Sequence, residues 1–488
     1  MDDTAHTPRV LLVAPPWQEL LGDFRAAARF ACVSPPQGLT YLAGALLQDG
    51  AECTIVDMEA EGVGAEELLG RIALLEPHLV GITATTPVYH TACELAAQIK
   101  ARRPELPLAL GGVHATIMGR QVLEQCPHWD LVVTGEGEQT VRRLAAAVAR
   151  PGAGRERYRG IRGVIYRRGD QVAQNPPRPA TEDLDSIPSP ARHLLDRQRY
   201  GHVVPGKGHV RYASLFTSRG CPYRCVFCSQ HTMYGRRMRY HSVERVMAEL
   251  TDIVVNQGVG HVVVMDENLA LDRRRLMSLC RAIQRSGLDF TWEGWTHAAT
   301  VDRTTLTAMR AAGMTRICFG IESGHPQILR RIKKGLTLAQ IRRAFRLARE
   351  VGLETRGAAM LGHPGETRQT AWATIRFVRG LRHCQQLFLN FACPYPGTEL
   401  YDLARRGEDG LRLLTTDFSR YQRYGDPVIA VNDLGPKELK RLQRLGLLMF
   451  YATPARAYHN LVRRAGLRGG LLTGAAFLQG IYSSWRRG

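Results

Sequence analysis

The sequence has little that would place the protein in a membrane or outside the cell. It has no run of about 20 mainly apolar residues, the length that a membrane-spanning helix requires. It begins Met-Asp-Asp-Thr without a basic and apolar leader, and its 11 cysteines are an odd number. Secreted proteins carry such leaders and pair their cysteines in disulfides. We therefore expect a cytoplasmic protein without a disulfide framework.

A nucleic-acid-binding module is also missing, although the formal net charge is +20 at pH 7. Arginine is spread through all regions, whereas nucleic-acid-binding proteins concentrate basic residues on one face. Hydrophobic residues at 44% and charged residues at 23% are usual globular values, and 488 residues suffice for two or three domains. We expect a folded multidomain protein with acidic cofactors or substrates, or an anionic surface, as partners, and no nucleic acid.

The chain has no second pair of cysteines separated by two residues, and this bears on its one cysteine triplet. Cys221, Cys225 and Cys228 lie in the run Arg-Gly-Cys-Pro-Tyr-Arg-Cys-Val-Phe-Cys, directly after a predicted strand at 213–217. Three thiolates can hold an iron-sulfur cubane and leave one iron free for another ligand. A zinc site completed by His231 is the less favoured alternative, because structural zinc usually pairs two knuckles. The triplet indicates a reactive metal centre.

Before the triplet, short apolar runs alternate with helix-length segments. The predicted strands are residues 10–14, 53–56, 79–83, 106–110 and 131–134. This alternation is typical of a parallel sheet covered on both faces, so we predict a doubly wound, flavodoxin-like α/β domain over residues 1–150. Prolines at 175–179 and a hairpin-like segment at 163–170 then predict a linker over residues 151–205.

Ligands of such sheets bind at the carboxyl ends of the strands. Glycines there let the backbone approach a large ligand, although tight turns require glycine as well. The candidate residues at these ends are Thr83, Gly111, Gly112, His114, Gly135 and Glu136.

A second alternation follows the cysteines and predicts a partial barrel over residues 206–400. Its six predicted strands are residues 213–217, 261–265, 290–292, 316–320, 356–361 and 386–390. Active sites of such barrels lie at the carboxyl ends of the strands. Carboxylates there can accept the ammonium group of a bound amino acid, or simply cap the next helix. The candidates are Asp266, Glu267, Glu322 and Ser323, with Gly362, Pro364 and Gly365 in a tight turn after the fifth strand.

These motifs together resemble a known family. The cysteine triplet, with Phe227 before its third cysteine, resembles the cluster loop of the radical S-adenosylmethionine (SAM) superfamily, and the run 361–367 resembles that family's Gly-x-Pro-Gly-Glu-Thr loop. The run 394–400 and the N-terminal domain resemble the cobalamin-linked class of this superfamily. His297 is a departure, because many relatives carry arginine there.

The resemblance implies three cofactors: a 4Fe-4S cluster on the triplet, SAM and cobalamin. It implies that residues 266–268 contact the SAM amino group and that residues 322–324 make polar contacts to SAM. The Asp-x-His-x-x-Gly run of classical cobalamin domains is missing after the first strand, which implies a cobalamin without a histidine ligand and makes His114 a loop or supporting residue.

The implied chemistry is cleavage of SAM to a 5′-deoxyadenosyl radical, followed by transfer of a methyl group from methylcobalamin to an unactivated carbon or phosphorus. Relatives with the same two domains instead perform oxidative cyclisation or rearrangement, and no side chain in the sequence separates these outcomes. A non-catalytic cobalamin- or zinc-binding regulator is the distant alternative. The resemblance also implies an electron donor such as flavodoxin or ferredoxin.

Residues 401–488 form the last predicted region, which we expect to be helical. Apolar residues at 436–451 follow a helical period and predict an amphipathic helix that covers the barrel opening or the substrate cavity. From residue 454 onward the chain carries arginines, the first of them Arg456, but no acidic residue. Such a segment can lie on anionic lipid, and peripheral membrane contact would favour an apolar or lipid-like small-molecule substrate.

Overall fold

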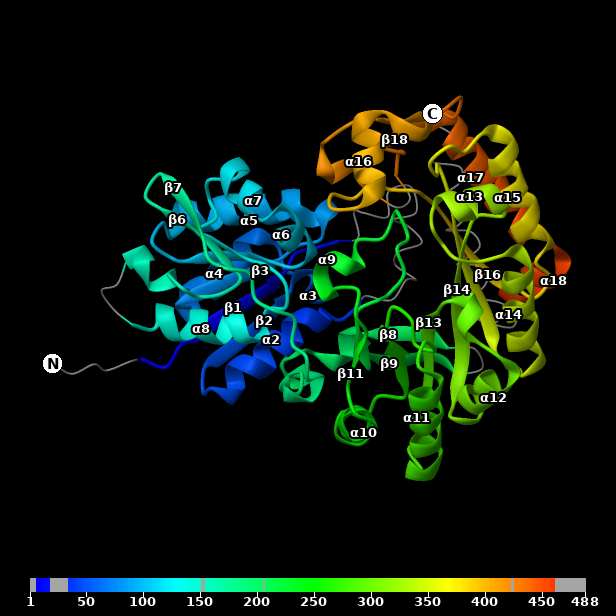
Figure 1. Cartoon of the computed structure of the whole chain (residues 1–488). Helices are drawn as coiled ribbons and strands as arrows, with labels where there is room; N and C mark the ends of the chain where they lie inside the picture. Colours follow the sequence, from blue (N-terminus) through cyan, green and yellow to red (C-terminus); the bar gives the residue numbers. More distant parts are fainter. Residues whose placement is uncertain (1–5, 18–33, 151–153, 205–206, 423–424, 461–488) are drawn as a thin grey trace. The chain divides into compact units, whose positions relative to one another are not determined.

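Two separate sheets organise the chain. The computed structural model describes residues 6–17, 34–150, 154–204, 207–422 and 425–460. The chain divides into two compact units, of which the first runs through Arg199 and includes residues 230–235, and the second begins at Tyr200. In Figure 1 the first sheet is blue to cyan and the second is green to yellow.

The first unit contains the predicted doubly wound sheet. Its parallel strands follow the order β2 (Glu52–Asp57), β1 (Arg9–Ala14), β3 (Leu79–Thr83), β4 (Leu108–Gly111) and β5 (Leu131–Val133). This 2-1-3-4-5 order is that of flavodoxin-like sheets, so the fold prediction is confirmed. The hairpin β6 (Val164–Arg168) and β7 (Gln171–Gln174) continues the sheet beyond β5 through antiparallel pairs.

Helices cover both faces of this sheet. The helix α2 (Gln37–Gln48) packs against α8 (Glu138–Val148), and α4 (Ala65–Leu75) packs against α5 (Tyr89–Arg102) on the opposite face (Figure 1). Gly44 of α2 lies so close to residues 187–191 that an added Cβ would be 2.1 Å from the Ser189 carbonyl oxygen. Part of the predicted linker therefore packs tightly on the first unit. The shorter helices are α3 (Met58–Glu61), α6 (Val113–Met118), α7 (Arg120–Gln125) and α9 (Gln230–Tyr234).

The second unit contains the predicted six parallel strands. Their order is β9 (Gly208–Leu215), β12 (His261–Val264), β13 (Thr291–Thr296), β14 (Met314–Glu322), β15 (Glu354–Leu361) and β16 (Gln386–Phe391), with β8 (Gly201–Val204) antiparallel beside β9. The rings of Trp295 on β13 and Phe388 on β16 lie 6.5 Å apart although two strands separate them in the sheet. Such a contact requires a curled sheet, and the half-barrel prediction is confirmed.

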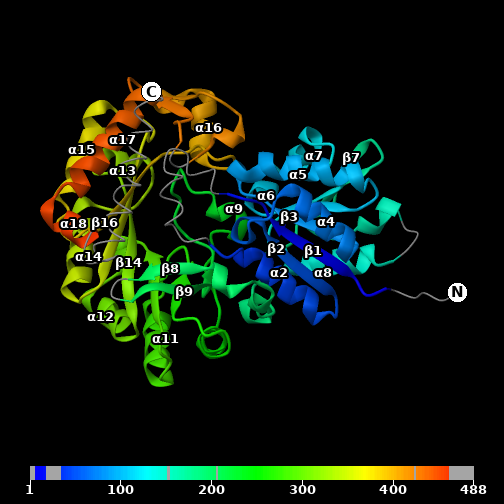
Figure 2. The same ribbon diagram turned by 180° about the vertical axis from the view of Figure 1, so that it is seen from behind.

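Alternate residues of each strand face opposite sides of this curled sheet. Residues such as Ile317, Phe319 and Ile321 of β14 belong to the apolar core under the helices, whereas Arg316 faces inward and meets Glu293 of β13. The outer helices are seen well in Figure 2. They are α10 (Val243–Thr251), α11 (Arg273–Ser286), α12 (Arg303–Ala311), α13 (Pro326–Arg331), α14 (Leu338–Glu350) and α15 (Arg368–Gly380).

The predicted amphipathic helix is α17 (Pro436–Tyr451), and it lies along the edge strand β16. Gln443 Nε2 donates to the Leu389 carbonyl over 2.8 Å, and the Tyr451 hydroxyl bonds both the N–H and the carbonyl of Leu387, at 3.0 and 3.1 Å. Covering an edge strand blocks pairing with another chain. That α17 also covers a substrate opening remains a prediction. The remaining elements are α16 (Glu399–Arg406), β17 (Leu411–Leu413), β18 (Ile429–Val431) and α18 (Pro454–Tyr458).

Arg456 does not face lipid as the basic C-terminal pattern suggested. Its side chain is buried, and it donates to the carbonyls of Cys384, Arg379 and Leu381 near the end of α15. A guanidinium has five N–H donors, and here they satisfy carbonyls at a helix end. The arginines that follow lie in residues 461–488, outside the described part of the chain. Within the described residues no helix combines the length and hydropathy needed to cross a bilayer.

Candidate active site

The three candidate cluster ligands share one loop at the carboxyl end of β9. The short strand β10 (Ser218–Arg219) precedes the loop and pairs with β11 (Arg239–Tyr240), so the chain is fixed on both sides of it. Cys221, Cys225 and Cys228 are all half-buried and free of disulfides. The loop thus places three cysteines at the end of the barrel where such folds bind their ligands.

Asp266 anchors the start of this loop. One carboxylate oxygen accepts the backbone N–H groups of Thr217 and Ser218, at 2.7 and 3.2 Å, and the other accepts their hydroxyls, at 2.6 and 2.7 Å. A carboxylate has about four acceptor sites, and the protein occupies four here. Asp266, predicted to contact the SAM amino group, therefore holds the loop in place in this structure.

Glu267 is the neighbouring carboxylate, and it is left with an unpaired oxygen. Its Oε2 is buried without a hydrogen-bond partner among the described residues, and burial raises the pKa of Glu267 to about 8. Burial also raises the pKa of the Cys221 thiol, and the Glu267 charge acts in the same direction, so Glu267 is within electrostatic range of the cysteine loop. An unpaired buried carboxylate next to a metal-ligand loop can accept a cationic group such as an ammonium.

The three cysteines come from a single loop, whereas structural zinc usually pairs two short ligand knuckles. Three thiolates suit a cubane cluster, which leaves one iron free for another ligand. Burial raises the pKa of Cys225 to about 11, so this thiol requires a bound metal to become a thiolate at neutral pH. The donor set fits an iron-sulfur cluster.

Glu322 and Ser323 end the fourth strand of the half barrel and have different surroundings. Glu322 has a positive φ of 61° and its Oε1 accepts from Lys334 Nζ at 2.8 Å. The Ser323 hydroxyl lies 3.1 Å from Thr374 Oγ1 of α15 and accepts from the N–H of His325 at 3.1 Å. Ser323 is fully buried in these contacts, so its predicted role toward SAM stays a prediction.

The turn at residues 362–366 is closed by its own glutamate. Glu366 Oε2 accepts the N–H groups of Gly362 and His363, whereas its Oε1 is buried without a partner among the described residues. Burial raises the pKa of Glu366 to about 7. Pro364 is buried, and at Gly365 (φ 68°) an added Cβ would overlap the Arg331 guanidinium. The motif therefore builds a rigid turn beside Glu322, whose carbonyl lies 3.3 Å from His363 Nε2.

His297, the departure from the family pattern, supports the cysteine loop. Its ring stacks on Tyr223, between the first two cysteines, at a centroid distance of 4.2 Å, and its Nε2 lies 2.9 Å from the Lys334 carbonyl oxygen. Burial, aided by Lys334, lowers the pKa of His297 to about 4. A neutral imidazole therefore packs against the loop at neutral pH.

The candidate residues of the first unit meet at one edge of its sheet. Thr83 and Gly111 are the last residues of the neighbouring strands β3 and β4, and Gly135 follows β5. Gly112 has φ 91°, and an added Cβ would lie 2.7 Å from Thr83 Oγ1, so only glycine fits. No described protein atom lies within 4 Å of a Cβ placed at Gly111 or Gly135, so their backbone is open to a large ligand.

His114 and Glu136 are buried at the same edge. His114 stacks on Tyr89 at 4.1 Å, its Nδ1 lies 3.2 Å from Thr86 Oγ1, and burial lowers its pKa to about 4. Glu136 Oε2 accepts the N–H of Thr181 over 2.9 Å. Both residues thus have partners within the first unit, and the interpretation of His114 as a supporting residue fits its packing.

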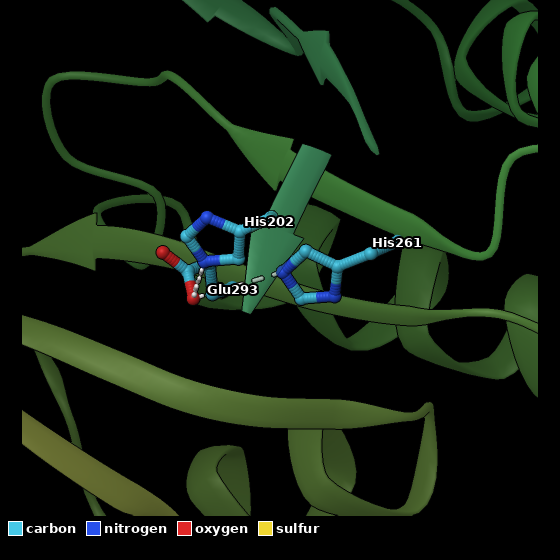
Figure 3. A group of neighbouring side chains, drawn as sticks. All are labelled: His202, His261 and Glu293. Atoms are coloured by element: carbon cyan, nitrogen blue, oxygen red, sulfur yellow. Dashed lines mark hydrogen bonds and ion pairs between the residues drawn. The ribbon is translucent and has the colours of Figure 1, made fainter. Parts of the chain in front are cut away.

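A second group of potential metal ligands lies on the half barrel, at the amino ends of the strands. His202 and His261 both turn toward the Glu293 carboxylate, with N–O distances of 3.3 and 3.7 Å (Figure 3). Arg316 Nη1 lies 2.5 Å from the same carboxylate oxygen and 3.2 Å from His202 Nε2. A guanidinium already occupies the place that a metal would take, so this group is a buried ion-pair network.

Sequence reasoning missed Lys334 and this network. Lys334 lies in the run Arg-Arg-Ile-Lys-Lys-Gly, where several basic residues suggest a solvated surface and no periodicity marks the buried one. Arg316 is a charged residue at the start of a predicted strand and Glu293 directly follows one, which is the signal that could have indicated inward-facing charges.

Comparison with known proteins gives matches for both units. Residues 215–378 match the model of the radical SAM superfamily, and residues 26–145 match that of the B12 binding domain. An uncharacterized methyltransferase of Pyrococcus horikoshii is 33% identical over 91% of this chain and 93% of its own length. An anaerobic magnesium-protoporphyrin IX monomethyl ester cyclase of Cereibacter sphaeroides is 30% identical over 91% of this chain and 72% of its own.

A solved structure has the same fold. The radical SAM methyltransferase TsrM from Kitasatospora setae, with cobalamin and a 4Fe-4S cluster bound, aligns over 99% of both chains with a TM-score of 0.69 at 19% identity.

A flavodoxin-like domain, a half barrel and a loop with three cysteines outside any disulfide define a two-domain metalloenzyme. The chain belongs to the cobalamin-dependent enzymes of the radical SAM superfamily. The residues present fit the family's cofactors, since the triplet supplies three thiols, Glu267 an unpaired carboxylate oxygen, and Gly111 and Gly135 an open backbone.

Proposed function

We propose that the protein methylates an unactivated carbon or phosphorus centre of a small molecule, with SAM as the source of both the radical and the methyl group. The observation that carries this proposal is the unpaired Glu267 oxygen beside the cysteine loop, in a chain that also has a cobalamin-type domain. When bound, the cluster supplies the electron for SAM cleavage and cobalamin carries the methyl group. The full-length relationship to a methyltransferase supports the same reaction.

The protein's own residues hold and orient the reactants. Cys221, Cys225 and Cys228 would bind three irons, and the Glu267 carboxylate would accept the SAM ammonium. The Asp266 contacts fix residues 217 and 218 at the start of the loop, which would restrict the loop before the cofactor binds. Thr83, Gly111, Gly112, Gly135 and Glu136 would form the cobalamin-binding edge, Gly362, Pro364 and Gly365 the turn next to SAM, and Ser323 a further polar contact.

The inner face of the half barrel favours an apolar or aromatic substrate. Met265 and Phe388 are 38% and 37% exposed although both follow the inward alternation of their strands, and the Trp295 ring is within 19° of parallel to that of Phe388. Large apolar groups exposed inside a binding site are typical of apolar ligands. If the substrate is apolar, the methyl-accepting activity of a cell extract will partition into its organic-soluble fraction. Recovery of that activity in the aqueous fraction would reject an apolar substrate.

The reaction is tested by anaerobic reconstitution with iron, sulfide and hydroxocobalamin, followed by SAM, a reductant and cell extract. Methylation requires extract-dependent formation of both 5′-deoxyadenosine and S-adenosylhomocysteine, and transfer of label from methyl-labelled SAM to a product. A variant with all three cluster cysteines changed to alanine is the control. Extract-stimulated 5′-deoxyadenosine without S-adenosylhomocysteine would reject methylation and favour the second candidate, an oxidative cyclase or rearrangement enzyme, which the cyclase relative supports.

Two partners complete the proposal. A one-electron donor such as flavodoxin or ferredoxin would reduce the cluster, and the basic segment after the described residues would contact anionic lipid. Because Arg456 has a structural role, the membrane test removes residues 461–488 and keeps the chain through residue 460. Co-sedimentation with anionic liposomes should be lost in this truncated protein, and unchanged sedimentation would reject membrane contact.

A further inference from the structure

One lysine is buried beside the cysteine loop. Lys334 is 9% exposed, and its Nζ donates to Glu322 Oε1 at 2.8 Å. The same Nζ lies 6.0 Å from the centre of the Phe227 ring, next to Cys228. Two residues before the lysine, the Ile332 carbonyl accepts the N–H of Val226 over 3.1 Å. The lysine segment and the cysteine loop are therefore hydrogen-bonded to each other.

The backbone is specialised to bring this ammonium and carboxylate together. Glu322 has φ 61° and Lys333 has φ 55°, a left-handed conformation that costs non-glycine residues free energy. On the same strand as Glu322, Gly320 leaves space for the pair, because an added Cβ would lie 2.3 Å from Glu322 Oε1 and 2.7 Å from Lys334 Nζ. Two residues with left-handed backbone and a glycine in place of a larger residue therefore surround this one ion pair.

The lysine charge also acts on the cluster ligands. The Lys334 ammonium lies within electrostatic range of Cys221 and Cys225. The adjacent Lys333 is different, because its half-exposed side chain pairs with Glu399 at 2.6 Å. Two neighbouring lysines thus have separate roles, one at the surface and one beside the thiols.

We propose that Lys334 is a positioning residue for the radical reaction, whose buried ammonium, held by Glu322, favours the reduced state of the bound cluster. A one-electron donor adds one electron to the cluster, no bond or proton changes, and the site becomes more negative by one unit of charge. A fixed positive charge nearby stabilises that state. The role rests on the proposed radical SAM reaction, but it concerns only electron entry.

The test is the reduction potential of the anaerobically reconstituted protein, measured without SAM, cobalamin or substrate. In Lys334→Met we expect the reduction equilibrium to shift about tenfold toward the oxidised cluster, which is about 59 mV for a one-electron couple. Lys334→Arg keeps the charge and should restore the wild-type potential. Glu322→Gln leaves the ammonium uncompensated and should raise the potential. Lys333→Met is the matched control and should match the wild type.

A Lys334→Met protein with full iron content and an unchanged potential would overturn the proposal. If that variant takes up no iron, Glu322→Gln decides, because an unchanged potential there would equally overturn it. Since no methyl acceptor is present, the measurement is independent of the methylation proposal. If the variants show the expected potentials but the wild-type protein forms no methylated product, only the methylation proposal is rejected.

Discussion

The two ends of the half barrel use charge in opposite ways. At the amino ends of β12 to β15, every charged group of the inner network lies against an opposite charge, as Arg316 does between Glu293 and Glu354. At the carboxyl ends, Glu267 and Glu366 each keep one buried oxygen without a protein partner among the described residues. Arg316 Nη2 is also buried without a hydrogen-bond partner among the described residues, so the contrast concerns ion pairs. The charges at the amino end are ion-paired, whereas neither Glu267 nor Glu366 has an ion-pair partner among the described residues.

This difference distinguishes charged groups that stabilise the fold from groups that can bind a cofactor. A buried charge is tolerated only when it is paired, and breaking such a pair is costly. Unpaired buried groups destabilise the ligand-free protein and become favourable when a ligand matches them. We therefore expect substitutions at the amino ends to lower stability. Substitutions at the carboxyl ends should weaken cofactor binding or, where they remove an unpaired carboxylate, raise the stability of the cofactor-free protein.

The largest expected effect is loss of the cluster. Cys225→Ala removes one of three ligands, and we expect iron content near zero and no reductive cleavage of SAM. Cys318→Ala is the matched control, because Cys318 is a buried cysteine of β14 outside the triplet, and it should retain iron. Iron and sulfide analysis after reconstitution gives the answer. Full iron content in Cys225→Ala would contradict the assignment of this ligand.

Arg316→Met tests the ion-paired network at the amino ends. It leaves Glu293 and Glu354 without their shared guanidinium, so we expect a loss of about 3–5 kcal/mol in the free energy of unfolding. Arg303→Met breaks an exposed pair with Glu350 and should cost at most about 1 kcal/mol. Urea unfolding of both variants checks the contrast. Equal effects would show that the network is not a stability element.

Glu366 gives a pH dependence at the carboxyl end. Burial raises the pKa of Glu366 from 4.5 to about 7, so the unfolded chain loses this proton first, and stability falls as the pH rises between these values. Glu366→Gln removes this loss, and we expect it to gain up to about 3 kcal/mol relative to wild type between pH 5 and pH 8. Thermal unfolding at both pH values measures the gain. A constant difference between the two proteins would refute the raised pKa.

Glu267→Gln should have the smallest of these effects on free energy. Losing a charge-assisted contact to the SAM ammonium should weaken SAM binding about 10- to 100-fold, with iron content unchanged. Equilibrium binding to the reconstituted protein measures this, and the exposed Glu408→Gln is the control. Wild-type affinity in Glu267→Gln would assign the ammonium to another group.

Local patterns in the sequence were sufficient to predict the strands of both sheets and the cysteine loop. Apolar runs of strand length, separated by helix-length segments, placed all five parallel strands of the first sheet and all six of the second. The cysteine spacing and the Gly-His-Pro-Gly-Glu-Thr turn carried the family resemblance, because both are read within about ten residues. The linker prediction did not anticipate that residues 164–174 would extend the first sheet, since pairing with β5 depends on distant strands.

Only the tertiary structure decided which polar groups are paired. Asp266 and Glu267 are adjacent carboxylates in the sequence, yet four donors from residues 217 and 218 occupy the first and none of the described donors reaches Oε2 of the second. Lys333 and Lys334 differ in the same way, and Arg456 is a buried helix cap inside a basic segment. Residue type and spacing determine the fold and the metal loop because they act locally. Burial and partner choice depend on atoms that the fold brings together from far along the chain.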